Sequence, residues 1–364
     1  MMRPWRIIGW PALRRGLALT ALLLVLSGCA AVVTEPQAPR GDLLWPPLPM
    51  ESRIQWLREI HSREDAGISM GFWEKLSTYV VGDTSREIVK PYGIFVDRSG
   101  RIFVVDTAAA VLHVYDPVAN RYLAIGDGKE RLFMTPIGIA SDGEGTLFIT
   151  DAGAAAVFRY DVDRQALTPF LAGVLGRPTG IAFFPGNRLL YISDTTTHQV
   201  VVFDLTGRER FRIGRRGTAP GTFNYPTDLC LSARGELYVT DALNSRIQVF
   251  DADGNFLRSF GASGDTPGYL AKPKGVALDS EGHVYVADAL QDTVQIFDPD
   301  GTLLLNFGAV GQGPGQFWMP AGLFIDGNDL IYVADTYTRR VQVFKYLRTE
   351  GGAGGTRAVP ERRP

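Results

Sequence analysis

Apolar and polar residues alternate in short runs along most of this chain, and the runs recur with a long period. A Pro-x-Gly triplet, once replaced by Pro-x-Asp, begins an apolar run six times, at steps of 42–48 residues. Alternation with a period of two predicts β-strands with one buried face. The six triplets begin at Pro91, Pro136, Pro178, Pro226, Pro273 and Pro320.

Two further strands follow each triplet at nearly constant spacing. About fifteen residues on, an apolar run ends in Asp, and ten residues beyond that Asp an aromatic-rich run closes. Gly turns such as Asp253-Gly254 connect the runs, which is typical of hairpins. With a fourth run before the next triplet, each unit predicts a four-stranded propeller blade, so the expected fold is all-β, a six-bladed β-propeller. The strand-ending aspartates, called the blade aspartates below, are Asp106, Asp151, Asp194, Asp241, Asp288 and Asp335.

The ends of the repeat array predict how the ring closes. Five units end in an outer strand, whereas the sixth lacks one, and residues 53–60 alternate in the same way upstream of the first unit. We expect this N-terminal strand to pair with residues 340–347 in the last blade, which protects two strand edges. The propeller would then span residues 51–348, with a short amphipathic helix at 69–80. The tail, 349–364, lacks apolar periodicity and is expected to be disordered.

The order of these motifs resembles the NHL repeat: a Gly-rich linker ending in Phe, Pro-x-Gly, an aromatic strand ending in Asp, and a strand of the form V-x-V-F-D. Units four to six match closely and units one and two more loosely, over roughly residues 88–347. The resemblance implies a six-bladed NHL-type propeller. Lipoproteins similar to this chain occur in bacteria rich in multihaem c-type cytochromes, which implies an envelope redox complex as one setting.

The first 28 residues have the features of a secretory signal peptide. Four arginines and no acid accompany an apolar run at 17–26, which is too short to span a bilayer as a helix. The run leads into Leu26-Ser27-Gly28-Cys29, which resembles the lipobox of bacterial lipoproteins. The resemblance implies that Cys29 is lipidated and becomes the first mature residue. The alternative is an ordinary signal peptide with a chance cysteine.

The lipobox resemblance also implies where the protein lies. Ala30, rather than Asp, follows Cys29, and in the sorting pattern that this resembles such a residue directs a lipoprotein to the outer membrane. Residues 29–50 are Pro-rich and are expected to tether the domain to the bilayer. The expected location is the periplasmic face of the outer membrane, with membrane contact through the lipid anchor.

Charge and composition exclude several functions. The formal net charge is −2, and it becomes −6 without residues 1–28, so nothing favours a nucleic-acid partner. Two cysteines and four histidines exclude a disulfide framework, a Cys-rich zinc module and a c-type haem attachment. We predict no cofactor.

The blade aspartates are interpreted as structural. Each ends a strand just before a turn, where a short carboxylate can accept backbone N–H bonds, and six equivalent copies fit six equivalent turns. The Gly-rich linkers, such as 308–315, are also interpreted as turns, because a phosphate-binding loop needs a helix behind it.

Six-bladed relatives include enzymes, so a metal site is the main catalytic alternative. The resembling amidating lyases place zinc-binding histidines near the starts of inner strands, and lactonase-like propellers hold calcium with oxygen ligands around the channel. At the matching positions this chain has no histidine, and Asp228 is the one acid, whereas calcium needs several oxygen ligands. We predict no metal site, since the histidines are scattered: His61, His113, His198 and His283.

Asp228 departs most clearly from the repeat, because the other five units have Gly there. It could project into the channel and bind a cation or a polar ligand, with Tyr92 and Lys274 flanking the same mouth. Alternatively, it could bond to neighbouring backbone N–H groups. Cys230, in the same apolar strand, is interpreted as a buried thiol.

The turns after the first two blade aspartates contain small residues, whereas those of the other four blades are polar. Adjacent blades would present these small residues as one smooth patch, on which a protein partner could dock. Alternatively, alanine simply fills tight turns. The residues concerned are Ala108, Ala109, Ala110, Ala154 and Ala155.

These observations favour a non-catalytic role over a catalytic one. The sequence predicts a membrane-anchored propeller that binds or organises envelope proteins. The alternative is a metal-dependent lyase or hydrolase with its site in the central channel.

Overall fold

The computed structural model of the protein describes residues 43–69, 87–126 and 132–348. Within these ranges the chain forms strands β1 to β25 and one 3₁₀ turn, η1 (Ala242–Asn244). No helix of this part is long and apolar enough to cross a membrane. The signal peptide, Cys29 and the C-terminal tail lie outside the described residues, as does the predicted helix apart from residue 69.

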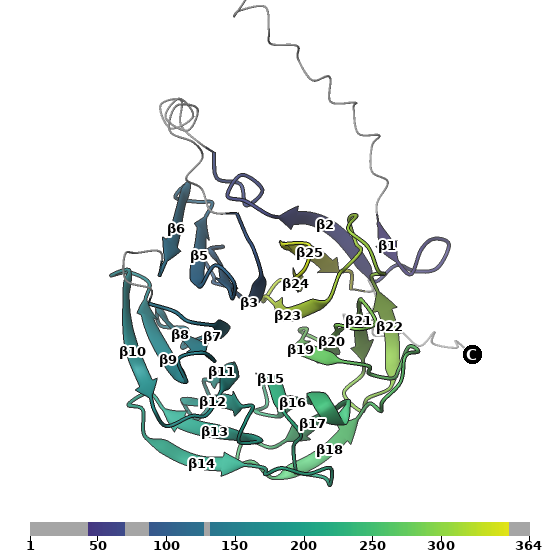
Figure 1. Ribbon diagram of the computed structural model, residues 1–364. Helices are drawn as coiled ribbons and strands as arrows, with labels where there is room; N and C mark the ends of the chain where they lie inside the picture. Colours follow the sequence, from purple (N-terminus) through teal and green to yellow (C-terminus); the bar gives the residue numbers. More distant parts are fainter. Residues whose placement is uncertain (1–42, 70–86, 127–131, 349–364) are drawn as a thin grey trace, which may run out of the picture. The chain divides into compact units, whose positions relative to one another are not determined.

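The strands form six antiparallel sheets around a central channel, which confirms the six-bladed propeller (Figure 1). In the order from the innermost strand outwards, blades 1 to 3 are β3 (Pro91–Val96), β4 (Ile102–Asp106), β5 (Val111–Asp116), β6 (Arg121–Ile125); β7 (Pro136–Ser141), β8 (Thr146–Asp151), β9 (Ala156–Asp161), β10 (Ala166–Ala172); and β11 (Pro178–Phe184), β12 (Leu189–Asp194), β13 (Gln199–Asp204), β14 (Glu209–Ile213). In the same order, blades 4 to 6 are β15 (Pro226–Leu231), β16 (Leu237–Asp241), β17 (Arg246–Phe250), β18 (Phe256–Phe260); β19 (Pro273–Leu278), β20 (Val284–Asp288), β21 (Thr293–Phe297), β22 (Leu303–Phe307); and β23 (Pro320–Ile325), β24 (Leu330–Asp335), β25 (Arg340–Tyr346), β2 (Ile54–Ile60), β1 (Leu44–Trp45).

Every inner strand begins at the Pro of its triplet and carries a bulge directly after it. In blade 1, Pro91 pairs with Asp106 but Ile94 pairs with Val104, so the inner strand has one extra residue. The same shift occurs in the other five blades. A bulge redirects side chains, and the Gly beside it lets neighbouring inner strands approach. A Cβ added to Gly93 would lie 2.5 Å from the carbonyl oxygen of Ile137 in the next blade.

The hydrophobic core lies between neighbouring blades. Tyr285 and Val294 of blade 5, for example, belong to one buried cluster with Val333 and Phe344 of blade 6. Strands β4, β16 and β20 are buried at every position. Because each sheet is covered by the next, burial of apolar area couples the stability of all six blades.

The N-terminal strand closes the ring as predicted. β2 pairs antiparallel with β25, from Ile54 opposite Tyr346 to Ile60 opposite Val341. The Arg340 guanidinium contacts Glu59 of β2 at 2.6 Å, which adds a charged hydrogen bond to the strand pairing.

β1 adds a fifth strand within the segment assigned to the tether. Leu44 and Trp45 pair with β2. The Trp45 ring lies 5.9 Å from the Phe344 ring and 6.0 Å from the Phe307 ring, so an aromatic anchor explains why the folded part begins before residue 51.

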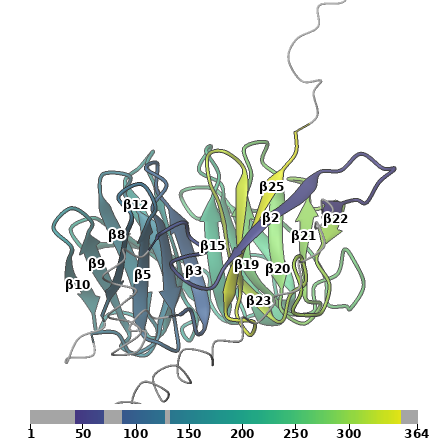
Figure 2. The same ribbon diagram turned by 90° about the horizontal axis from the view of Figure 1, so that it is seen from above.

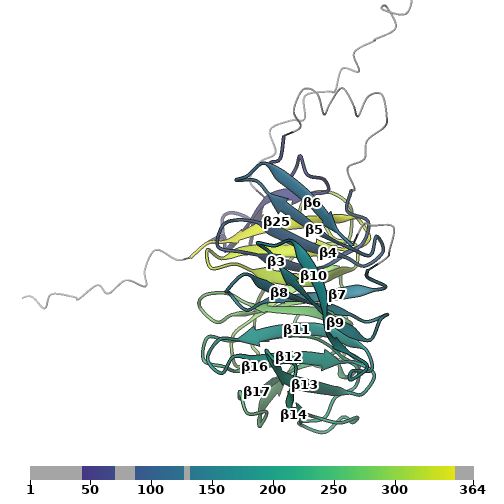
Figure 3. The same cartoon turned by 90° about the vertical axis from the view of Figure 1, so that its left-hand side faces the viewer.

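The turns that connect the strands lie on two opposite faces of the ring. The side views show both faces edge-on (Figures 2 and 3). The close approaches between neighbouring Pro-x-Gly segments place the starts of the inner strands at one end of the channel. The blade aspartates pair with these starts, so we call this side the aspartate face. It contains the turns after the blade aspartates and the linkers between blades. The opposite face contains the remaining turns.

Candidate functional site

The blade aspartates hold the turns of the aspartate face together. Asp106 accepts hydrogen bonds from the backbone N–H groups of Val89 (2.6 Å), Lys90 (3.1 Å), Ala108 (3.1 Å) and Ala109 (2.8 Å). All six blade aspartates are 0% exposed and each accepts at least one such bond. The geometry matches their structural interpretation.

The Gly-rich linkers are turns braced by buried side chains. Gln342 donates to the carbonyl oxygen of Gln316 (2.6 Å) and accepts from the N–H of Gly315 (2.8 Å). Gln295 and Gln248 make the equivalent bonds in blades 5 and 4. These linkers therefore serve the packing of the blades, in agreement with the interpretation of the sequence.

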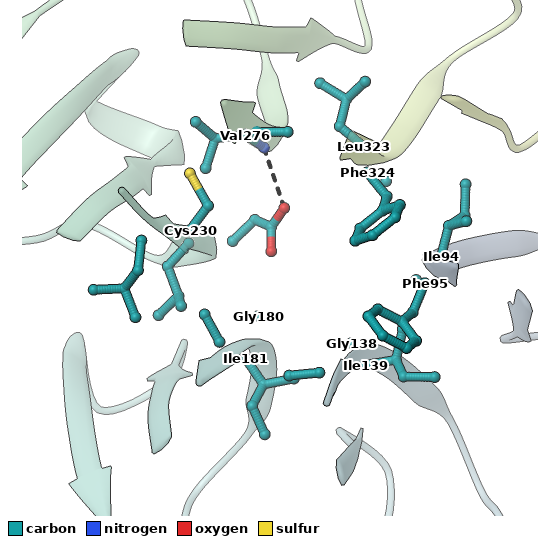
Figure 4. Close-up of a pocket in the computed structure, with 18 of the residues that line it drawn as sticks. Ile94, Phe95, Gly138, Ile139, Gly180, Ile181, Cys230, Val276, Leu323 and Phe324 are labelled. Carbon is teal, nitrogen blue, oxygen red and sulfur yellow. Dashed lines mark hydrogen bonds between the residues drawn. The ribbon is translucent and has the colours of Figure 1, made fainter. Parts of the chain in front are cut away.

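The central channel contains a cavity of about 270 Å³ lined by all six inner strands. Its walls are mainly apolar. Phe95 and Phe324 lie together on one side, with ring centroids 5.4 Å apart, while Ile181 and Cys230 lie across the cavity from them (Figure 4). Polar side chains are few, and they include Tyr92, Asp228 and Ser141.

Asp228 lines this cavity and also bonds to backbone, so both sequence interpretations describe part of its geometry. Its Oδ2 accepts a hydrogen bond from the N–H of Val276 in the next blade (3.2 Å), marked by the dashed line in Figure 4. Gly180 of the preceding blade leaves room for the side chain, since a Cβ there would lie 2.8 Å from Asp228 Oδ1. Burial raises the pKa of the Asp228 carboxyl to about 7, against backbone hydrogen bonds from Val276 and Leu229 that favour the ionised form.

Tyr92 and Lys274 lie towards the aspartate-face end of the channel. Tyr92 lines the cavity, and burial raises the pKa of its hydroxyl well above the usual value, with Asp228 adding to the shift. Lys274 is half-buried in β19. Burial, and then the like charges of Lys272, Arg177 and Lys90, lower the pKa of its ammonium.

Sequence reasoning missed Lys90, Arg177 and Lys272. Each occupies the position immediately before the Pro of a triplet, in blades 1, 3 and 5. That shared position is a signal in the repeat alignment, although the other three blades have uncharged residues there.

Cys230 and the four histidines do not gather into a metal-binding group within the described residues. Cys230 is half-buried at the channel wall, and burial raises the pKa of its thiol well above the usual value. His113 is buried in β5 beside Tyr122 Oη (2.8 Å), and His283 lies beside Asp279 (2.8 Å). Over 43–69, 87–126 and 132–348, no three His, Cys, Asp or Glu side chains come together to hold a metal ion. The donors along the channel wall therefore do not fit the zinc or calcium sites of the resembling enzymes.

The alanine patch is smaller than its sequence suggests. Ala108 is exposed and Ala109, Ala154 and Ala155 are half-buried, but Ala110 is only 2% exposed. Ala110 and Ala155 have positive φ values of 55° and 50°, as do the equivalent residues of the other four blades. The tight turn thus accounts for part of this pattern.

The two faces differ strongly in surface character. On the aspartate face, turns and linkers of every blade expose large apolar or aromatic side chains: Val89, Leu132, Met134, Val174, Tyr225, Leu243, Tyr269, Leu290, Val310, Trp318 and Tyr337. Basic side chains lie among them, at Lys90, Arg177, Arg215, Arg216, Lys272 and Arg339, and outnumber the acids outside the blade aspartates, which within the described turns and linkers are Glu87, Asp265 and Asp292. On the described turns of the opposite face, three large apolar side chains are exposed: Leu48 and Met50 in the turn between β1 and β2, and Val118. Exposed arginines also lie there, at Arg98, Arg164, Arg188, Arg208 and Arg234. Acids are more numerous and occur in every blade: Asp97, Asp116, Asp142, Glu144, Asp161, Asp163, Asp204, Glu236, Asp251, Asp253, Asp279, Glu281, Asp298, Asp300, Asp326 and Asp329.

Comparisons with known families support the repeat architecture. A family model described as "SMP-30/Gluconolactonase/LRE-like region" matches residues 146–262 and 215–308. A second, described as "6-bladed beta-propeller", matches residues 276–349. No curated protein sequence matches the chain significantly.

Solved structures share the fold at low sequence identity. A protein of unknown function from Bacteroides thetaiotaomicron has a TM-score of 0.61 at 15% identity, over 80% of this chain and 75% of its own. Virginiamycin B lyase from Staphylococcus aureus has a TM-score of 0.54 at 14% identity, over 71% and 96%. A calcium-binding protein, regucalcin, from Agrobacterium tumefaciens has a TM-score of 0.53 at 17% identity, over 71% and 90%. The chain is thus a six-bladed β-propeller with SMP-30/gluconolactonase-like repeat regions.

Proposed function

We propose that this protein is a lipid-anchored, non-catalytic binding module of the bacterial cell envelope. Its propeller binds a protein partner through the aspartate face and so organises an envelope complex, with a cytochrome-associated redox complex as one setting. Cys29 carries the lipid, and the protein lies at the periplasmic side of the outer membrane.

The contrast between the two faces is the observation that carries the proposal. Most of the large apolar and aromatic side chains exposed on the described turns lie on one face, with Leu290 60% exposed, Tyr337 50% and Trp318 46%. Exposed groups of this kind mark interaction sites, and aromatic residues and arginine are enriched in protein interfaces. The acids of the opposite face keep that side soluble.

The same contrast describes the partner. The aspartate face combines exposed apolar side chains with unpaired cations. It therefore fits a partner surface with an apolar centre and acidic groups around it. Electrostatic steering would bring the basic face towards such a partner and turn the acidic face away.

Affinity capture tests the proposal. Tagged protein is crosslinked in native membranes and purified, alongside a Leu290→Asp/Tyr337→Asp variant and an Ala109→Glu/Ala154→Glu variant of the predicted rim. A Val118→Asp variant of the opposite face is the matched control. We expect a discrete partner that both aspartate-face variants lose and the control retains. Unchanged capture by the Leu290→Asp/Tyr337→Asp variant would contradict the proposed face.

The anchor is tested separately. Metabolic labelling with palmitate should label the wild-type protein and leave a Cys29→Ser variant unlabelled. The variant should also leave the outer-membrane fraction. Labelling that survives in the Cys29→Ser variant would contradict lipidation at this residue.

A metal-dependent lyase or hydrolase is the second candidate, favoured by the match to the SMP-30/gluconolactonase-like model. Metal analysis of the purified protein, with Asp228→Ala as the control, distinguishes the two. Stoichiometric zinc or calcium that Asp228→Ala abolishes would favour the enzyme.

A further inference from the structure

We propose that the central channel binds a small organic anion with an apolar body, whose charged head lies among the basic side chains at the aspartate-face mouth. The site goes beyond the proposed partner-binding role, and it is tested with the isolated protein.

The basic side chains are placed by the repeat itself. Lys90, Arg177 and Lys272 each precede the first residue of an inner strand, and the backbone N–H of each donates to its blade aspartate. They therefore occupy equivalent positions in blades 1, 3 and 5, which alternate around the ring. Lys274 lies two residues beyond Lys272 in the inner strand of blade 5.

These cations have no acidic partners in the part of the chain that the structure describes. None of the four forms an ion pair there, whereas Arg246 and Arg340 on the same face pair with blade aspartates. Lys90 instead lies over the Tyr337 ring, 5.5 Å from its centroid. Like charges gathered without counter-charges repel one another, and a bound anion would relieve this repulsion.

The cavity of the central channel determines which kind of body the ligand can have. The cavity of about 270 Å³ extends from Tyr92 towards the opposite-face ends of the inner strands, and side chains such as Phe95, Ile181 and Phe324 offer an apolar wall to an apolar body. The four cations are not among its lining residues, so the ligand has to reach from them into the cavity. A purely inorganic anion would gain nothing from these walls. An acid with an aliphatic or aromatic body would contact both parts of the site.

Asp228 sets the orientation of the ligand. Its carboxylate lies in the cavity and is bonded to Val276 N–H, so it repels a second anion that descends past the mouth. The charged head therefore remains among the lysines while the apolar end enters the channel.

Calorimetric titration tests this site with octanoate as the probe. The protein used is the chain from residue 30 onward, which keeps every described strand of the closed ring and avoids detergent. At pH 8 we expect one octanoate per protein. Hexanoate should bind roughly fifteenfold more weakly, because it buries two methylene groups fewer in the channel. Acetate and 1-octanol should also bind more weakly than octanoate.

Charge variants distinguish octanoate binding at the channel mouth from non-specific binding elsewhere on the protein. A Lys272→Gln/Lys274→Gln variant should lose affinity for octanoate by about tenfold. Arg234→Gln, in an exposed turn of the opposite face, is the matched control and should bind as wild type does. Circular dichroism checks that both variants are folded.

Three results would overturn the proposal: no octanoate binding, equal binding by octanoate and acetate, or equal octanoate binding by the folded Lys272→Gln/Lys274→Gln variant. Failure of this site leaves partner capture by the aspartate face unaffected. Loss of partner capture, in turn, leaves the titration unaffected.

Discussion

The roles of single residues in this propeller could be predicted where a residue either recurs in every repeat or departs from the repeat. The blade aspartates could be predicted as structural because six equivalent copies precede six equivalent turns. Asp228 could be singled out because Gly occupies its position elsewhere. Lys90, Arg177 and Lys272 could not be found in this way. Each looks like an ordinary linker residue in the sequence, and only the closed ring brings blades 1, 3 and 5 around one channel.

The repeated role of the blade aspartates predicts a large cost for removing one. Asp288 accepts N–H bonds from Ala271 (2.7 Å), Lys272 (3.0 Å) and Leu290 (3.1 Å). Asp288→Ala leaves these donors unpaired at a buried site and should lower the free energy of unfolding by about 3 kcal/mol in urea titrations. Asp300→Ala, in an exposed turn of the opposite face, is the control and should change it by less than about 0.5 kcal/mol. Equal stability of the two variants would contradict the structural role.

Asp228 predicts a specific pH dependence of stability. Its pKa is raised to about 7 in the folded protein, whereas an unfolded carboxyl titrates near pH 4. Between these values the folded state holds a proton that the unfolded state has released, so this group makes stability fall as pH rises from about 4 to 7.

Asp228→Asn should remove that contribution while keeping an acceptor for Val276 N–H. Asp228 is only half-buried in β15, and solvent screening reduces the penalty of its charge, so we expect the variant to be roughly 1–3 kcal/mol more stable than wild type at pH 8. The two proteins should be about equally stable at pH 4. Urea titrations across this range measure the difference, and parallel pH profiles would contradict the raised pKa.

At the scale of elements, ring closure was predictable and its outer edge was not. The missing outer strand of the sixth unit and the alternating pattern of residues 53–60 together predicted β2. β1 has only two residues, too few for any periodic pattern, and it depends on contacts of Trp45 with Phe307 and Phe344 that no local pattern reveals.

Deletion of residues 51–62 tests the closure. Loss of β2 exposes the edge of β25 and removes the contact between Glu59 and Arg340, so the whole propeller should unfold at lower temperature in one cooperative transition. Deletion of residues 349–364 is the control and should leave the melting temperature unchanged. An unchanged melting temperature after deletion of 51–62 would rule out closure by this strand.

At the scale of the whole molecule, the repeat specifies the fold but only the assembled ring shows the two faces. The sequence predicted six blades because the period and the strand count are repeated features. The contrast between a basic, apolar face and an acidic face arises from scattered turn residues, each with a different place in its unit. Sequence patterns therefore predicted the alanine rim, a local departure from the repeat, but not the larger surface around it.

The central claim is that the aspartate face binds an envelope protein, and site-specific photo-crosslinking in cells tests it most directly. A photoreactive amino acid is placed at Leu290 on the aspartate face or at Val118 on the opposite face, both well exposed at 60% and 81%. We predict a discrete crosslinked protein from position 290 and none from position 118. The same crosslinks from both positions, or a crosslink from position 118 alone, would contradict the account.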